Sequence, residues 1–460
     1  MKTRITLLLV ALFVSFNISF AQQDEECMNN LSIFDSYVKS KKYDDAFGPW
    51  KLVREKCPKF NRAIYVHGEK ILKHKIDNSA GGEQVAFVKD LMLLYDQSNE
   101  YFASKHPKGE VLGDKAQLMY KHRKALNATD AQIYDAFDKA FTEDLDNFKS
   151  PQGLYTYFSL VVDLYDAGKK TAQQMFDKYD DVNDKIEVEV ENASQQLNKL
   201  NAKEESGQAL TKKEGRYKTF YERTLEAYDQ ISSSMDSKLG ERANCEVLIP
   251  LYQKDFEEFK NDATWLQRAM NRMYAKECTD DPMFVKVVQQ KNTLEPNAST
   301  AYYLGILKDK EGNSSEALKY YNQSISLETD DIKKARLNKK IGEKFYRSGN
   351  YSRARQYYRE ALKLNPSDGS PYLRIAAMYA KSANNCGDTN FNKRAVFWLA
   401  ADEARKAGRV DPRLRKAAAQ TAANYEAKAP TKSEIFTEGN KGQTIRIGCW
   451  IGSSVVVPSN

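Results

Sequence analysis

The chain has 460 residues, of which 29% are charged, and its mean hydropathy is −0.67. Apart from the N-terminus there is no strongly apolar run, so we expect a soluble protein with several cores or one extended array. The net charge of +7 is small for this length and its basic and acidic residues are interleaved, which argues against nucleic-acid binding and leaves only a mild attraction to anionic surfaces.

Residues 1–21 predict a secretory signal peptide. Lys2 and Arg4 precede an apolar run from Ile5 to Phe16, and Ser19 and Ala21 place small residues at −3 and −1 of a cleavage site. The alternative is a retained membrane anchor, for which the apolar run is too short. Removing these residues would lower the net charge from +7 to +5, because Lys2 and Arg4 are their only charged side chains.

Residues 22–110 predict helical hairpins. Ala46 and Trp50 lie four residues apart on a predicted helix that Pro58 follows, and Gly68 occupies the small-residue position of the next hairpin. A Gly-rich insertion at 78–82 displaces that hairpin's second helix.

The six cysteines suggest three disulfides in an exported chain. Residues equidistant from the turn of an antiparallel helical hairpin lie opposite each other. One predicted turn, near Lys41, lies midway between Cys27 and Cys57. Another, near Asn261, lies midway between Cys245 and Cys278. The expected pairs are Cys27–Cys57, Cys245–Cys278 and, by elimination, Cys386–Cys449. Buried free thiols are the alternative. We predict no metal site and no cofactor, since there is no CxxC and the histidines show no i,i+4 pairing with one another.

Residues 111–240 predict further helices that end in two long ones. Narrow apolar stripes run from Val182 to Leu197 and from Tyr217 to Ile231, on either side of the polar stretch 202–213. We expect two antiparallel helices joined by a polar loop. They form either an arm that protrudes toward a partner or an elongated repeat with solvated outer faces, the second being favoured.

Residues 241–296 predict a hairpin unit stapled by Cys245 and Cys278, and two clear repeats follow within residues 297–430. In both, a Gly precedes an Ala by twelve residues and an aromatic residue follows the Ala by four. These residues are Gly305, Ala317 and Tyr321, then Gly342, Ala354 and Tyr358. The pattern resembles the tetratricopeptide repeat, a helix–turn–helix unit. The resemblance implies small residues where the two helices meet, aromatics that fill the gap to the next repeat, and a concave surface for partners.

The C-terminal part predicts a divergent third repeat with an insertion at Cys386, a capping helix over about 414–428, and a tail over 431–460. The tail turns to period-two, β-branched residues and predicts a short β-hairpin held by Cys449. The whole chain resembles an exported Bacteroidota family of repeat proteins that shares Pro49-Trp50, Cys57-Pro58 and a tail over 447–451. That resemblance implies a periplasmic location and no settled activity.

The predicted fold is therefore all-α: a tetratricopeptide-like α-solenoid with a long helical hairpin arm and a short C-terminal β-hairpin tail. No phosphate-binding loop, nucleophile elbow or metalloprotease motif occurs, so we expect no enzyme. The repeat register places seven residues on the groove side of the first helices: Tyr302, Ile306, Asp309, Arg336, Lys339, Glu343 and Tyr346. They do not reproduce the Lys/Asn clamp by which some proteins of this kind hold chaperone C-termini.

We expect a periplasmic scaffold for protein–protein interactions, peripheral to the outer membrane as an accessory of an assembly or secretion complex. The alternative is a cell-envelope structural or glycan-binding protein. A groove filled by the chain's own neighbouring helices is the structural alternative to a partner site.

Overall fold

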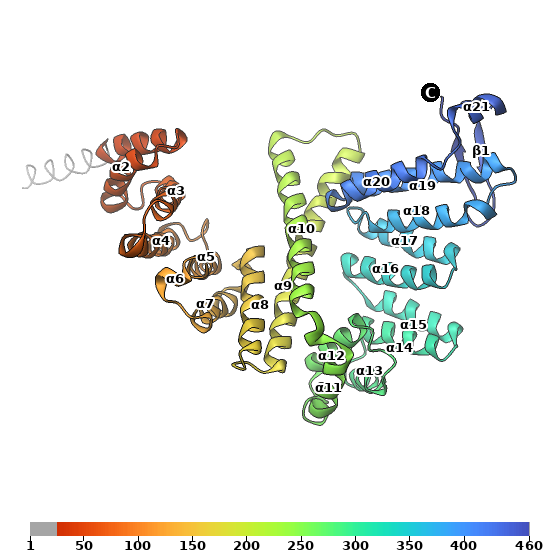
Figure 1. Cartoon of the computed structure of the whole chain (residues 1–460), viewed down its shortest axis with the longest axis horizontal. Coiled ribbons are helices and arrows are strands. Elements are labelled where there is room, and N and C mark those ends of the chain that lie inside the picture. Colours follow the sequence, from red (N-terminus) through yellow and green to blue (C-terminus); the bar gives the residue numbers. More distant parts are fainter. Residues whose placement is uncertain (1–24, 460) are drawn as a thin grey trace, which may run out of the picture. The chain divides into compact units, whose positions relative to one another are not determined.

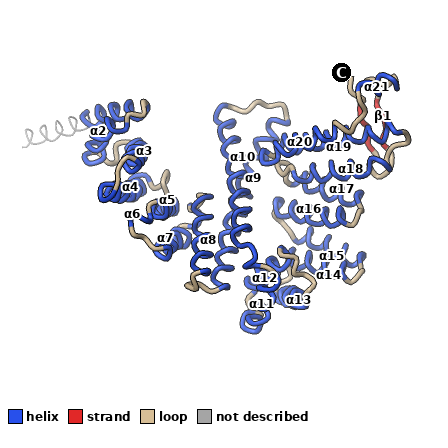
Figure 2. Tube along the Cα trace, viewed as in Figure 1, coloured by secondary structure: helices blue, strands red, loops and turns tan. Residues whose placement is uncertain are grey.

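The structure, a computed structural model, describes residues 25–459, so the predicted signal peptide lies outside the described residues. Helices make up most of the described chain (Figure 2). It forms two compact units, one ending at Val182 and the other beginning at Asn183. The boundary therefore falls inside one long helix, α9 (Ala172–Glu205), within the region 111–240.

The first unit is a series of helices packed against their neighbours along the chain (Figure 1). It contains a helix over residues 25–39, α2 (Tyr43–Lys56), α3 (Ala63–Asp77), α4 (Gly81–Phe102), α5 (Lys108–Lys121), α6 (Arg123–Leu126), α7 (Asp130–Glu143), the 3-10 turn η1 (Leu145–Asn147), α8 (Pro151–Asp166) and the start of α9. Local signals set the helix starts. Ser150 Oγ accepts the N–H of Gly153 at 3.1 Å, with Pro151 at the first helical position. Such a cap is worth about 1 kcal/mol.

Trp50 is the centre of the first hairpin's packing. Its side chain is fully buried, and its indole N–H donates to the carbonyl of Ile64 at 2.7 Å. Gly68 is required beside it, because a Cβ there would lie 2.6 Å from the indole nitrogen. The small residue predicted at this position thus makes room for the neighbouring aromatic side chain.

The second unit contains the rest of α9 and the helices that follow it. These are α10 (Lys212–Leu239), η2 (Gly240–Ala243), α11 (Cys245–Phe259), α12 (Ala263–Ala275), α13 (Pro282–Leu294), α14 (Ala298–Lys310), α15 (Ser314–Leu327), α16 (Asp331–Arg347), α17 (Tyr351–Leu364), α18 (Ser370–Ser382), η3 (Ala383–Asn385), α19 (Asn390–Val410), η4 (Pro412–Leu414), α20 (Arg415–Glu426) and α21 (Lys432–Glu438). The pairs α14–α15 and α16–α17 are the two clear repeats, and α18–α19 is the divergent third one.

The aromatics of the clear repeats pack within their own hairpin and also toward the next repeat. Tyr321 lies over Gly305, and Tyr358 lies over Gly342, so each ring covers the glycine of its own repeat. A Cβ added at Gly305 would stand 2.5 Å from the Tyr321 ring. Each tyrosine also reaches the following repeat: Lys344 of α16 donates to the Tyr321 hydroxyl at 3.1 Å, and Tyr358 shares a core with residues of α18.

The long hairpin α9–α10 lies against the repeats of the second unit. Its own core includes Leu197 and Leu225. Glu187 of α9 forms an ion pair with Arg336 of α16 at 2.9 Å, and η4 contacts α10 at the far end of the repeat stack. This part of the arm is therefore anchored to the repeats along its length.

The structure contains the three expected disulfides, two predicted from the hairpin symmetry and the third by elimination. Their Cα–Cα distances are 6.4 Å for Cys27–Cys57, 5.4 Å for Cys245–Cys278 and 5.1 Å for Cys386–Cys449. The first two join the ends of helical hairpins. The third closes a 63-residue separation and ties the tail to the insertion between α18 and α19.

The tail is an antiparallel hairpin of β1 (Thr444–Ile447) and β2 (Ser453–Val456). Ile447 and Ile451 are buried in the core formed by α17, α18 and α19. Trp450 packs there too: its indole N–H donates to Ser382 Oγ at 2.9 Å, and Arg355 lies over its ring. The tail thus covers the last repeat.

Candidate functional site

The structure brings four of the seven predicted groove residues into ion pairs within the chain, sets a fifth against an arginine and buries a sixth. Tyr302 is 1% exposed, and its hydroxyl hydrogen-bonds that of Tyr274 at 2.7 Å. It is a core residue, because α12 packs directly against it. Asp309 pairs with Lys344 and accepts a hydrogen bond from Tyr321, so its charge is satisfied within the chain.

Three of the remaining positions contact charged or aromatic side chains of the chain itself. Lys339 donates to Asp368 at 2.6 Å. Glu343 accepts the hydroxyl hydrogen of Tyr358 at 2.9 Å and pairs with Arg374 at 3.0 Å. Tyr346 lies beneath the same Arg374, whose guanidinium carbon is 5.4 Å from the ring centre. These residues are half-buried and hold neighbouring repeats together.

Arg336 faces the chain's own helix α9, through its pair with Glu187. The chain thus fills part of its own groove, which was the structural alternative to a partner site. Ile306 is half-buried on α14. The seven predicted positions therefore do not form one open binding surface.

An open site does exist beside them, between α9 and the first helices of the repeats. We call it the α9 hollow. It has a volume of about 420 Å³. Its principal lining residues are Glu187 from α9, Asn271 and Tyr274 from α12, Tyr303 from α14, and Arg336 and Lys340 from α16. Volumes of this size and a mixed lining of aromatic and polar groups are typical of ligand sites.

Lys340 is an exposed cation of this hollow. In the part of the chain that the structure describes, no ion pair involves its ammonium group, which lies 5.8 Å from the ring centre of Tyr274 and 5.6 Å from that of Tyr302. Desolvation lowers its pKa from the usual value, and the positive charges of Arg336 and Lys339 lower it further, while Glu187 acts in the opposite direction. An anion placed beside Lys340 would counter the repulsion from Arg336 and Lys339, as Glu187 does in part.

The hydrogen-bonding groups of the hollow are held in place by neighbours. The Tyr303 hydroxyl donates to Asn271 Oδ1 at 2.9 Å, and the same oxygen accepts from Gln267 at 3.0 Å. Asp330, the N-cap of α16, accepts the N–H of Lys333 at 2.8 Å and so fixes the start of the helix that carries Lys340. The walls of the hollow are thus preformed.

The repeat register missed Tyr274, Tyr303 and Lys340. Register positions describe an isolated stack of repeats, and they do not show that α9 lies across α16. The available signal was the basic character of α16, in which Lys333, Arg336 and Lys340 recur at helical spacing.

No helix among the described residues has both the length and the apolar character needed to cross a membrane.

Comparisons with known proteins agree with the hairpin geometry. The tetratricopeptide repeat family model matches residues 335–368, which cover most of α16 and all of α17. Photosystem I assembly protein Ycf3 of Prochlorococcus marinus subsp. pastoris is 30% identical over 125 residues, covering 25% of this chain and 72% of that protein. The Ycf3 of Prochlorococcus marinus strain NATL1A is 27% identical over 120 residues, covering 26% of this chain and 69% of that protein.

Two solved structures are also similar. A tetratricopeptide repeat protein from Parabacteroides merdae shares 10% identity, covers 68% of this chain and 97% of its own, and has a TM-score of 0.24. Yeast Tom70 shares 12% identity, and the match covers 89% of this chain and 78% of Tom70, with a TM-score of 0.26. We draw no conclusion from structural likenesses of this size. The matched repeat, the Ycf3 relatives and the glycine–tyrosine packing of α14–α17 show that the chain belongs to the tetratricopeptide repeat family.

Proposed function

We propose that this chain is an exported scaffold that binds a protein partner and holds an acidic segment of it in the α9 hollow. The observation that carries the proposal is the ammonium group of Lys340, which forms no ion pair among the described residues and lies near two tyrosine rings in an open hollow on the repeat helices. Repeat stacks of this family bind partners on such surfaces. The proposal assigns binding to the chain and no chemical step.

The charges of the hollow favour a carboxylate-bearing partner. Lys333, Arg336 and Lys340 supply three cations, against the two carboxylates of Glu187 and Glu328. Glu187 already engages Arg336, so an incoming carboxylate would meet Lys340 and Lys333. A solvent-accessible ion pair contributes about 0.2–1 kcal/mol, so several contacts must act together to give a stable complex.

We place this function in the periplasm, beside an outer-membrane assembly or secretion complex. Support for export comes from the predicted signal peptide and from the three disulfides, which form and persist in oxidising compartments. The hollow would then meet an envelope protein.

Charge reversal tests the proposal. Lys340→Glu should reduce recovery of the partner in affinity purification from the periplasmic fraction by tenfold or more, as measured by quantitative mass spectrometry. Lys319→Glu is the matched control, because Lys319 is an exposed lysine on α15 outside the hollow. Equal loss in both variants, or in neither, would contradict the proposal.

A pull-down on isolated peptidoglycan separates the alternative of a glycan-binding protein. Retention of the wild type and of Lys340→Glu alike, with no protein partner recovered, would favour the alternative.

A further inference from the structure

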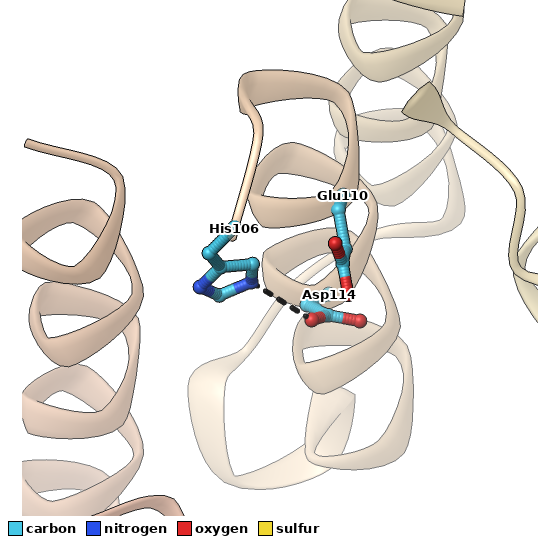
Figure 3. A group of neighbouring side chains, drawn as sticks. All are labelled: His106, Glu110 and Asp114. Atoms are coloured by element: carbon cyan, nitrogen blue, oxygen red, sulfur yellow. Dashed lines mark hydrogen bonds and ion pairs between the residues drawn. The ribbon is translucent and has the colours of Figure 1, made fainter. Parts of the chain in front are cut away.

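Three side chains with metal-binding atoms converge at the start of α5 in the first unit (Figure 3). His106 lies just before the helix, and Glu110 and Asp114 follow at four-residue spacing on one helix face. One ligand atom from each residue lies within 4.8 Å of the other two, and His106 Nε2 is 3.4 Å from Asp114 Oδ2. Among the described residues, no other trio of histidine, cysteine or carboxylate side chains meets this closely.

The group faces a small cavity of about 90 Å³ with a net negative lining. Glu69 also lines the cavity, so three carboxylates stand against the two cations Arg62 and Lys105. A bound cation would offset the repulsion among these carboxylates.

The backbone and the imidazole are fixed by other contacts. The His106 ring packs edge-on against the Tyr95 ring, with 5.6 Å between the ring centroids. The backbone carbonyl of His106 accepts a hydrogen bond from the Asn99 side-chain amide at 2.9 Å. At the helix start, the N–H of Gly109 donates to Asp144 at 2.8 Å. These contacts hold His106 and the start of α5 in place.

We propose that His106, Glu110 and Asp114 bind a divalent first-row transition metal ion, with zinc as the best-fitting case. Two ligands of a tetrahedral zinc ion with bonds of about 2.0–2.1 Å lie about 3.3–3.4 Å apart, which matches the separation of His106 and Asp114. An imidazole favours zinc over calcium or magnesium, which prefer oxygen ligands alone. Three protein ligands leave a fourth position for water. The ion joins the α4–α5 connection to the first two turns of α5.

The spacing of the histidines alone gives no sign of this group, because both partners of His106 are carboxylates. His67 with Asp35 and His74 with Asp44 are two other histidine–carboxylate pairs of this unit, and each contains only one carboxylate. A histidine of such a pair therefore serves as a control for zinc binding at His106.

Calorimetric titration of the full oxidised chain with zinc chloride tests the site. We expect about one zinc ion per chain, and at least tenfold weaker binding for Asp114→Asn and for Glu110→Gln. His74→Gln is the control and should bind zinc like the wild type. Absence of zinc binding to the wild type at millimolar concentration would overturn the proposal, as would equal affinity in wild type, Asp114→Asn and Glu110→Gln.

Thermal unfolding gives a second readout that does not depend on heats of binding. Zinc should raise the unfolding temperature of the wild type and of His74→Gln, and it should leave that of Asp114→Asn unchanged. Glu110 is exposed, so Glu110→Gln should fold and give the same result if Asp114→Asn does not fold. A zinc-induced rise in Glu110→Gln equal to that in the wild type would overturn the proposal.

Discussion

Gly305 lies beneath the ring of Tyr321, so closely that a Cβ at residue 305 would stand 2.5 Å from the ring carbon Cε1. The hairpin α14–α15 depends on this contact. Gly305→Ala should therefore destabilise the second unit by about 1–2 kcal/mol, because overpacking costs about 1–3 kcal/mol and the better helix propensity of alanine returns up to about 1 kcal/mol. Urea unfolding followed by circular dichroism measures the change.

Gly215→Ala is the matched control for this prediction. Gly215 lies inside α10, and an added Cβ there would have no heavy atom within 4 Å. The same substitution should stabilise the chain by about 0.5–1 kcal/mol. A stabilising Gly305→Ala would show that Tyr321 does not fill this space.

The tail should depend on the Cys386–Cys449 disulfide. In the chain-entropy model, closing a separation of 63 residues stabilises the fold by about 4 kcal/mol. Replacing both cysteines with serine should lower the unfolding temperature and open residues 440–459 to proteolysis. Non-reducing peptide mapping checks the pairing directly, and a link from Cys386 to any other cysteine would contradict the structure.

The pair Lys339–Asp368 should make stability depend on pH. Burial alone would raise the pKa of Asp368, but the ammonium group of Lys339 and hydrogen bonds from Ser370 hold it below its usual value. A depressed carboxyl pKa contributes stability above the unfolded value of about 3.9, and that contribution is lost as pH falls through the folded value.

Asp368→Asn should accordingly unfold more easily than the wild type at neutral pH, and the difference should shrink below about pH 4. Unfolding free energies measured from pH 7 to pH 3 test this. A difference that stays constant over this range would show that the charge of Asp368 contributes nothing.

Glu187 should compete with the partner for Arg336. Arg336 Nη1 lies 2.9 Å from Glu187 Oε2, and the side chains of Arg336 and Glu187 are 30% and 51% exposed. A carboxylate of the partner can therefore replace Glu187 in this ion pair. Glu187→Gln would release Arg336 toward the α9 hollow and should raise the affinity for an acidic segment several-fold. Titration with the recovered partner measures the change, and weaker binding would mean that Glu187 orients Arg336 for the partner.

The repeats and the hairpins could be predicted from the sequence because their signals are local. Gly342 and Tyr358, or Cys27 and Cys57, are related through one turn, and their spacing alone places them together. The α9 hollow depends on contacts between segments far apart in the chain, such as Glu187 with Arg336. Helical periodicity gives no information on such contacts, and so Tyr302 was expected in a groove that α12 covers.

The most direct test of the account is a photo-crosslinking amino acid placed at residue 340, with residue 319 as the control position, in cells of the native organism. The account predicts an adduct with one envelope protein at residue 340 and none at residue 319, with the crosslinked peptide rich in Asp and Glu. Adducts of equal yield at both positions, or a crosslinked segment without acidic residues, would contradict it.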